Sequence, residues 1–284
     1  MTLSIIKSQF GNKPIQHIKK REYQIFLNEY GAKFSKASAK KLNGHIRTCV
    51  REAIEEGVIQ SDFTNKIIVT GKNEKFQEEK HLHYDESKQL LKEINANLHQ
   101  GKVYYILLLG LTTGMRFGEI IGLKREDFNF FKSTISINKT WGYLTRMHNG
   151  FGPTKNEKSN RVIRVAKHVM QAFKKLFKET PENIHQLVFF SSSSKYKVIS
   201  NSYANKVLRK LLNSLSIENL ITMHGLRHTH ASVLLYKKVS LLYVAERLGH
   251  TDTEMTSKTY AHILKELRQE DEEKTVEIFE VMAS

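Results

Sequence analysis

The chain has 284 residues, enough for one large domain or two smaller ones that each bury a core. Hydrophobic residues make up 40%, which is ordinary for a globular protein and argues against large-scale disorder. No apolar run approaches the roughly 20 residues that span a bilayer, and the N-terminal sequence lacks a signal-peptide pattern. The single cysteine, Cys49, excludes an intramolecular disulfide and a cysteine-based metal site. These absences predict a cytoplasmic protein.

The charge is strongly basic and unevenly distributed. Lysine and arginine number 45 against 29 acidic residues, a net charge of +16. Residues 1–80 carry a net +6, residues 81–261 a net +14, and residues 262–284 a net −4. Fixed positive charge releases condensed counterions from nucleic acid, so a basic body favours a polyanionic partner. The alternative is a basic protein without such a partner.

The first 75 residues read as a helical domain. Residues 18–30 have apolar side chains at helical spacing, and Gly31 is the expected stop. Ser35 can cap a second helix, with one apolar face, that ends at Gly57. The remaining surface of that helix is basic, with no acidic residue from Gly31 until Glu52, and forms a candidate DNA-binding surface. Its residues are Lys36, Lys40, Lys41, Arg47 and Arg51. A merely solvated face is the alternative.

The polar segment 71–81 is the best linker candidate, and we expect the domain linker at 76–84. Helices are expected at 85–98 and 103–113, the second mostly buried, and again at 116–123 after a break at Gly114. Residues 133–138 and 161–165 alternate like strands around a long polar connection, which predicts a small antiparallel sheet with an extended hairpin. Residues 187–190 are a further candidate strand, and helices resume from residue 201. The predicted fold is mainly α with a small antiparallel β-sheet.

Four short segments hold residues suited to chemistry, and each alone is a weak signal. TTGMRFGEI places Arg116 at a helix start, where unpaired N–H groups favour phosphate. An ion pair with Glu119 is the alternative. GPTKNEKSNRVIRV places Lys155 in the hairpin, where it could protonate a leaving alkoxide, although most loop lysines are simply solvated.

The other two segments lie near the C-terminus. HGLRHTHAS puts His224 and Arg227 on one helix face, with His228 and His230 elsewhere on the turn. A metal site is not favoured, because these histidines lack HExxH spacing and have no adjacent acidic ligand. ERLGHTDTEMTSKTYAH contains His250 after a glycine and Tyr260 ten residues later. With 11 tyrosines in the chain, a core role for this one is the alternative.

In this order, the four segments resemble the tyrosine recombinase (phage integrase) family, over roughly residues 15–270. The matching pattern is T-G-x-R-x-x-E, H-x-L-R-H, L-G-H and T-Y-A-H. The chain resembles in particular the integrases of Gram-positive transposons, integrative elements and phages. The resemblance implies a two-domain DNA clamp, with a helical core-binding domain at 1–75 and a catalytic domain at 85–284 that ends in a tail at about 265–284.

The resemblance also implies roles around a scissile phosphate. Arg116 and Arg227 match the arginines that hold its non-bridging oxygens. His250 matches a second donor to the same phosphate, and Glu119 matches an acidic residue that orients the site. Gly225 departs from the family, because an acidic residue is common at that position.

The remaining matches concern proton transfer and bond formation. Tyr260 matches the nucleophile, which forms a 3′-phosphotyrosine. Lys155 matches the general acid for the 5′-hydroxyl, and His224 matches a histidine that assists proton transfer or positioning. Asn156 stands where threonine is common, and Lys158 competes with Lys155 for the assignment. The chemistry implied needs no cofactor and no metal.

The implied function is integration and excision of a mobile element by a site-specific recombinase. Implied partners are double-stranded DNA with inverted-repeat core sites, three further copies of the chain in a tetramer on DNA, and an excisionase or DNA-bending protein. The localisation implied is the bacterial cytoplasm, with the nucleoid when DNA is bound. Many relatives carry an additional N-terminal arm-binding domain. We do not expect one within these 284 residues, which are either a naturally short protein or a fragment of a longer one.

The acidic tail contains an apolar stripe. Val276, Phe279 and Met282 recur at a spacing of three. The resemblance suggests that the tail docks on a neighbouring copy, and packing on its own domain is the alternative. Two other functions remain open from sequence: relaxation of DNA by a type IB topoisomerase, and DNA binding without catalysis.

Overall fold

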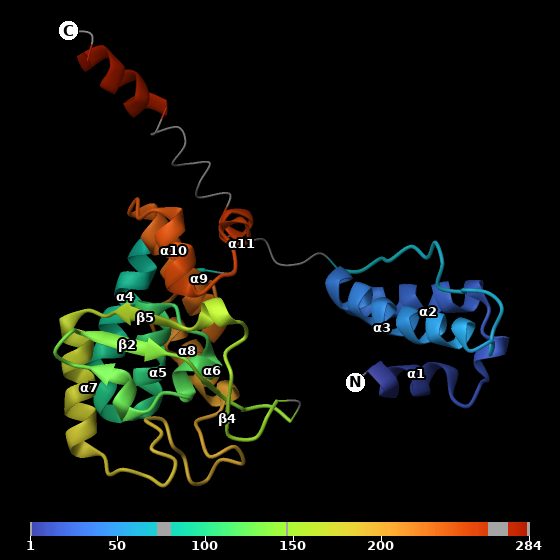
Figure 1. The fold of residues 1–284 in the computed structure, drawn as a ribbon, viewed down its shortest axis with the longest axis horizontal. Coiled ribbons are helices and arrows are strands. Elements are labelled where there is room, and N and C mark those ends of the chain that lie inside the picture. The colour runs from blue at the N-terminus through green and yellow to red at the C-terminus, as the bar shows by residue number, and fades with distance from the viewer. Residues whose placement is uncertain (1, 73–80, 146, 261–271, 283–284) are drawn as a thin grey trace. The chain divides into compact units, whose positions relative to one another are not determined.

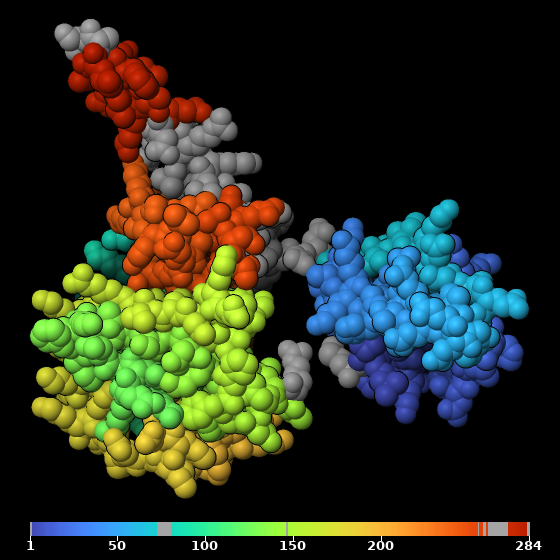
Figure 2. Space-filling model, viewed as in Figure 1, coloured from blue at the N-terminus to red at the C-terminus, as the bar shows by residue number. Residues whose placement is uncertain are grey.

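The computed structural model describes residues 2–72, 81–145, 147–260 and 272–282. The chain divides into two compact units, Met1–Phe76 and Gln77–Ser284 (Figures 1 and 2). Most of the segment in which we expected a linker, 76–84, lies outside the described residues, which resume at His81. No described helix is long and apolar enough to cross a membrane.

The first unit is a small helical bundle. It consists of α1 (Thr2–Phe10), the 3-10 turn η1 (Ile15–His17), α2 (Lys20–Lys33) and α3 (Lys36–Glu55). Apolar side chains from α2 and α3 meet in its core, among them Tyr23, Phe26, Leu27, Leu42, Ile46 and Val50. Ser35 caps α3 as predicted, since its Oγ accepts a hydrogen bond from the Ser38 amide at 3.3 Å.

Helix α2 does not stop at Gly31, as the sequence suggested, but continues to Lys33. A Cβ atom at Gly31 would lie 2.5 Å from the carbonyl oxygen of Thr70. The glycine therefore allows the segment before residue 72 to pack closely on the helix. The side-chain amide of Gln24 holds the same segment through two hydrogen bonds. Its Oε1 accepts from the Ile68 amide at 3.0 Å, and its Nε2 donates to the Ile68 carbonyl at 2.8 Å.

In the second unit, helix α5 (Lys102–Thr113) is the central element and is buried along nearly its whole length. It packs against α4 (Tyr84–Ala96), α8 (Asn201–Ser214) and α9 (Met223–Tyr236). The other helical elements are η3 (Leu98–Gln100), α6 (Phe117–Ile121), η4 (Arg125–Asp127), η5 (Glu157–Ser159), α7 (Lys167–Glu179), α10 (Leu241–Leu248) and α11 (Thr253–Thr259). A helix that is apolar on all sides is buried on all sides, which explains the run from Val103 to Leu111.

The sheet is small and antiparallel, as predicted. Its strand order is β1 (Phe128–Asn129), β2 (Thr134–Ile137) and β5 (Arg161–Arg164), with Thr134 opposite Arg164. The long connection between β2 and β5 contains a second hairpin, formed by β3 (Thr140–Trp141) and β4 (Phe151–Gly152). The predicted fold class, mainly α with a small antiparallel sheet, is confirmed.

Residues 187–190 do not form a strand. They make only isolated bridges, Lys124 with Leu187 and Phe190 with Val198. Leu187, Val188 and Phe189 are all buried. A continuous apolar run reflects burial on both sides, which a loop crossing the core satisfies as well as a strand does.

Candidate active site

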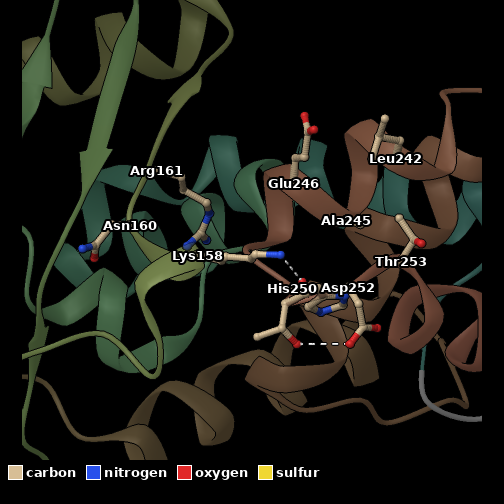
Figure 3. A pocket seen from close by; sticks show the side chains of 10 residues that line it. Lys158, Asn160, Arg161, Leu242, Ala245, Glu246, His250, Asp252 and Thr253 are labelled. Carbon is tan, nitrogen blue, oxygen red and sulfur yellow. Dashed lines mark hydrogen bonds between the residues drawn. The ribbon is translucent and has the colours of Figure 1, made fainter.

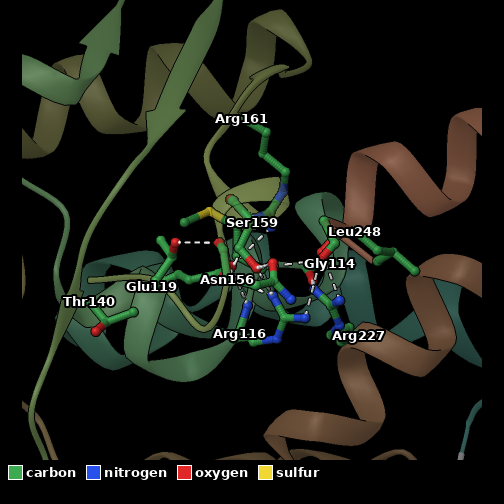
Figure 4. A network of polar contacts seen from close by, with 12 residues as sticks. Gly114, Arg116, Glu119, Thr140, Asn156, Ser159, Arg161, Arg227 and Leu248 are labelled. Carbon is green, nitrogen blue, oxygen red and sulfur yellow. Dashed lines mark hydrogen bonds and ion pairs between the residues drawn. The ribbon is translucent and has the colours of Figure 1, made fainter. Parts of the chain in front are cut away.

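Arg227 is fixed by the C-terminal ends of two helices. Its Nη1 donates to the carbonyl of Gly114, after α5, at 2.7 Å, and its Nη2 donates to the carbonyl of Leu248, at the end of α10, at 2.8 Å (Figure 4). The unpaired carbonyls at a helix C-terminus carry partial negative charge and stabilise a cation. Gly114 permits the close approach, because a Cβ atom there would lie 2.7 Å from Leu248 Cδ2.

The Arg227 guanidinium is almost completely buried, and this environment changes its pKa. Burial and the neighbouring charge of Arg116 lower the pKa of Arg227 to about 9. It therefore remains protonated at neutral pH. A guanidinium in such surroundings attracts a phosphate more strongly than one in water does, because the local dielectric constant is low.

Arg116 precedes α6 and shares its partner with a third arginine. Glu119 accepts from the Arg116 amide and from Arg116 Nη1, both at 2.9 Å, and from Arg161 Nη2 at 2.9 Å. Burial raises the pKa of the Glu119 carboxyl, but the charges of Arg161 and Arg116 outweigh it, so the pKa lies below its usual range. Glu119 is thus a buried carboxylate that orients Arg116.

The hairpin before β5 is joined to this cluster by Ser159. Its Oγ lies 2.7 Å from Asn156 Oδ1, 3.3 Å from Arg116 Nη1 and 3.4 Å from the carbonyl oxygen of Gly249 (Figure 4). Arg116 Nη2 also donates to Gly249, at 3.4 Å. The hairpin, α6 and the end of α10 therefore meet at one place.

His250 follows α10 and lines a surface pocket beside Lys158, Arg161 and Asp252 (Figure 3). Its Nδ1 lies 2.6 Å from Thr256 Oγ1 in α11. Burial and the charges of Arg227, Arg116 and Arg161 lower the pKa of His250 to about 4. His250 is therefore neutral at pH 7 in the DNA-free protein. It lies close enough to Arg227, Arg116 and Arg161 for their charges to act on it.

His224 is on the first turn of α9, which Thr222 caps through the Gly225 amide at 3.4 Å. His224 is exposed, but the surrounding protein excludes part of the water around its ring, and this desolvation lowers its pKa. The charges of Arg227, Arg116 and Lys155 lower this pKa further. Electrostatically, His224 and Lys155 thus belong to the arginine cluster.

Tyr260 directly follows α11 and is only 2% exposed. Its ring packs in a cluster with Ala231, Leu235, Val244 and Leu248, from α9 and α10. Its Oη lies 3.0 Å from Nδ1 of His228. Burial raises the pKa of Tyr260, and the charge of Arg227 opposes that rise.

The arrangement combines a fixed pair of arginines, two histidines and a buried tyrosine, a set that can bind a phosphodiester and attack it without a metal. Residues 80–266 match the phage integrase family, which is well over half of the chain. The chain belongs to the phage integrase family.

Individual relatives agree with this. The integrase of Staphylococcus phage L54a is 28% identical over 295 residues, covering 95% of this chain and 83% of the relative. A XerC-like tyrosine recombinase of Caldanaerobacter subterraneus is 25% identical, covering 92% and 71%. The chain is accordingly an enzyme of the tyrosine recombinase type.

Solved structures share the fold. The Tn1549 transposon integrase in complex with transposon right end DNA has a TM-score of 0.73 at 20% identity, covering 96% of this chain and 90% of that one. A lambda integrase dimer bound to a COC′ core site has a TM-score of 0.64 at 18% identity, covering 91% and 85%.

Within this integrase-family site, the two hairpin lysines differ in their surroundings. Lys158 Nζ donates to the carbonyl of Thr251 at 2.7 Å, and so lies along the pocket that His250 lines (Figure 3). Lys155 is exposed, and its charge acts on His224. Lys155 is therefore the better candidate to meet a substrate, as the sequence had suggested.

Sequence reasoning missed three residues that contribute to the site: Ser159, Arg161 and His228. It also placed His228 on a different side of the helix from His224, whereas the two rings lie 4.7 Å apart. Residues four apart share a helix face, and that spacing was the available signal. For Arg161 the signal was its place on the same strand face as Ile163 and Val165, which are buried. An arginine on the buried face of a strand needs a carboxylate partner.

The candidate DNA-binding residues of the first unit all lie on α3. Lys36, Lys40, Lys41 and Arg51 are exposed, whereas Arg47 is half-buried with its Nε 3.9 Å from Asp62. At 100° per residue, Lys40 and Arg51 lie on nearly the same side of the helix, and Lys41 lies about 100° away from Lys40. Lys40 and Arg51 therefore form an exposed basic stripe on α3, and Lys41 lies to one side of it.

Proposed function

We propose that this integrase-family enzyme cleaves and rejoins DNA at specific sites through a 3′-phosphotyrosine on Tyr260, and so integrates and excises a mobile element. The observation that carries the proposal is the buried, fixed Arg227, which lies within electrostatic reach of both Arg116 and Tyr260. Its relatives include the integrase of Staphylococcus phage L54a and the ICEBs1 integrase of Bacillus subtilis.

The proposed cleavage begins with phosphate binding. Arg116 and Arg227 hold the two non-bridging oxygens, and their charges meet the extra negative charge of the transition state. Their orientation does not depend on the substrate, because Glu119 and the carbonyls of Gly114 and Leu248 hold them beforehand. Removing one such donor typically costs about 3–4 kcal/mol of transition-state stabilisation.

The histidines act on the same phosphate. His250 is neutral and accepts from or donates to Thr256 through Nδ1. If the Thr256 hydroxyl is the donor, Nε2 of His250 carries the hydrogen and donates it to a phosphate oxygen. His224 lies among the charges of Arg227, Arg116 and Lys155, where it assists in positioning the phosphate.

The leaving group is the 5′-oxygen of the broken strand. We assign its protonation to Lys155, whose exposed position on the connection before β5 suits a group that closes over DNA. The phosphotyrosine conserves the energy of the broken bond, so a 5′-hydroxyl of another strand can attack it. Neither ATP nor a metal ion takes part in this scheme.

The proposed substrate is double-stranded DNA with inverted-repeat core sites. The basic stripe on α3 would contact phosphates from the first unit while the second unit performs the chemistry. We further propose a tetramer on DNA, with an excisionase or DNA-bending protein as accessory. Residues 272–282 are helical, and Val276, Phe279 and Met282 are each more than half exposed, which suits docking of the tail on a neighbouring copy.

A suicide substrate tests the proposal. The protein is incubated with a duplex that is nicked near the cleavage position, so that the short fragment diffuses away and the covalent adduct accumulates. The parent and a Tyr243→Phe control, which alters an exposed tyrosine of α10, are expected to form the adduct on a denaturing gel. A Tyr260→Phe variant that still formed it would refute the assignment.

A second arm separates recombination from relaxation. The enzyme is given two labelled duplexes with the element's end sequences, and joined products are measured beside the relaxation of a supercoiled plasmid without such sites. Joined products that require both sites support a recombinase. Relaxation without site dependence would indicate a topoisomerase.

A further inference from the structure

His228 is in contact with both histidine and tyrosine members of the site. Its ring lies edge to face with that of His224, one turn earlier on α9, with centroids 4.7 Å apart. The centroid of Tyr260 lies 5.9 Å from that of His228, and the Nδ1-to-Oη distance is 3.0 Å. Nδ1 is thus at hydrogen-bonding distance from the atom that attacks phosphorus in the proposed function.

We propose that His228 is the catalytic base that accepts the phenolic proton of Tyr260 during cleavage, an inference that rests on the proposed function. The bond between Tyr260 Oη and phosphorus forms as the bond from phosphorus to the 5′-oxygen breaks. The phenolic proton moves to Nδ1 of His228, and the 5′-oxygen takes a proton from Lys155. In rejoining, each proton returns along the same path.

The surroundings of Tyr260 make a base necessary. Its ring is only 2% exposed and packs against apolar side chains, so bulk water is a poor acceptor for its proton. Burial raises the pKa of Tyr260, which means that a free phenolate is disfavoured before attack. Arg227 stabilises negative charge on Oη, but a guanidinium has no lone pair with which to accept the proton.

His224 is less suited to that role. Lost hydration and the charges of Arg227, Arg116 and Lys155 all lower its pKa and weaken it as a base. The ring nitrogen at hydrogen-bonding distance from Tyr260 Oη belongs instead to His228, one turn further along the helix, where it can accept the phenolic hydrogen. The two residues therefore have different roles in this scheme. His224 acts on the phosphate, and His228 acts on Tyr260.

The test measures the rate of covalent capture on the suicide duplex. In the His228→Asn variant, Oδ1 can still accept a hydrogen bond near the place of Nδ1 but cannot take the proton. We expect capture to slow by about 10²-fold or more, the usual contribution of a general base, with DNA affinity unchanged. A His168→Asn variant, altered at an exposed position of α7, is the matched control.

A second measurement separates proton transfer from positioning. Trifluorotyrosine is introduced at position 260, because its more acidic phenol needs less help from a base. The rate difference between the parent and His228→Asn should then shrink at least about 10-fold, as expected when general-base catalysis becomes less important.

Each outcome bears on the inference. Capture by His228→Asn at the parental rate overturns it. Slow capture with a difference that fluorination leaves unchanged also overturns it, in favour of a positioning role. If His228→Asn no longer binds DNA, the same two measurements are made on His228→Gln, whose side-chain amide likewise cannot take the proton. Absence of any adduct in the parent would instead refute the proposed function.

Discussion

Arg161 and Glu119 form a buried double contact: Nη2 to Oε2 at 2.9 Å and Nη1 to Oε1 at 3.3 Å. The same arginine donates from Nε to the carbonyl of Arg247 at 2.7 Å. Strand β5 is thereby joined both to the carboxylate that orients Arg116 and to helix α10. Arg161 thus helps to hold Arg116, one of the two arginines proposed to bind the phosphate.

We predict that Arg161→Ala destabilises the second unit by about 3–5 kcal/mol, because it leaves the Glu119 carboxylate buried without its strongest partner. Arg164→Ala removes an exposed side chain from the same strand and should cost less than about 0.5 kcal/mol. Urea unfolding followed by fluorescence of the sole tryptophan, Trp141, reports on this unit. Equal midpoints for the two variants would contradict the supporting role.

Sequence alone predicted what depends on local patterns. The helices, the β2–β5 hairpin and the cap at Ser35 follow from periodicity and capping chemistry, and the fold class is confirmed. The candidate residues, from Arg116 to Tyr260, followed from resemblance to a family, because no local feature marks one tyrosine among 11 as a nucleophile.

What sequence could not supply depends on packing between distant segments. Residues 114 and 248 must meet before their carbonyls can hold Arg227, and no spacing in the chain encodes that meeting. The same holds for Gly31, whose lack of a side chain serves contact with Thr70 rather than the end of a helix. Burial of Tyr260 against α9 and α10 is likewise a tertiary property.

The Thr256 hydroxyl is expected to set the tautomer of His250. Thr256→Val keeps the shape of the side chain but removes the partner at 2.6 Å, so the hydrogen on His250 is no longer confined to Nε2. Loss of one such hydrogen bond, about 1.4 kcal/mol, predicts capture about 10-fold slower than in the parent. Thr256→Ser retains the hydroxyl and should capture at nearly the parental rate. Equally slow capture by both variants would point to packing instead.

Binding of DNA should take up a proton at His250. The pKa of this residue is lowered to about 4 by burial and three arginine charges, and a bound phosphate offsets those charges. Between about pH 4 and 6.5 the bound form therefore holds more protons, so affinity rises as the pH falls. Calorimetry at pH 5.5 in buffers of different ionisation enthalpy measures the uptake, with Tyr260→Phe to prevent cleavage. An added His250→Gln change should remove it, and undiminished uptake would assign it elsewhere.

The basic stripe of α3 should contribute to binding through phosphates. We predict that Lys40→Ala lowers the slope of log affinity against log salt by about 0.9, the value for one lost phosphate contact. Lys13→Ala is the control, because the Lys13 ammonium pairs with Glu22 at 2.6 Å and already has its charge offset. Binding of core-site duplexes at several salt concentrations gives both slopes. If the two variants had the same slope, the stripe would be a solvated face.

His230 should make the second unit sensitive to acid. It lies between helix ends, with Nδ1 2.9 Å from the Leu111 carbonyl oxygen and Nε2 accepting from Arg247 at 3.0 Å. Burial and the charge of Arg247 lower its pKa to about 3 from an ordinary value of 6.5. His230 is therefore neutral in the folded protein, and the contribution of this neutral histidine to stability is complete above pH 6.5.

Below pH 6.5 the unfolded chain binds a proton at His230 that the folded protein excludes, so stability falls as the pH falls toward 3. One such proton corresponds to a slope of about 1.4 kcal/mol per pH unit. His230→Asn is expected to be less stable at pH 7.5, because Arg247 loses its acceptor, yet to show a slope between pH 6 and 4 smaller by about that amount. Urea unfolding followed through Trp141 at several pH values measures both quantities. A slope equal to the parent's would mean that another group binds the proton.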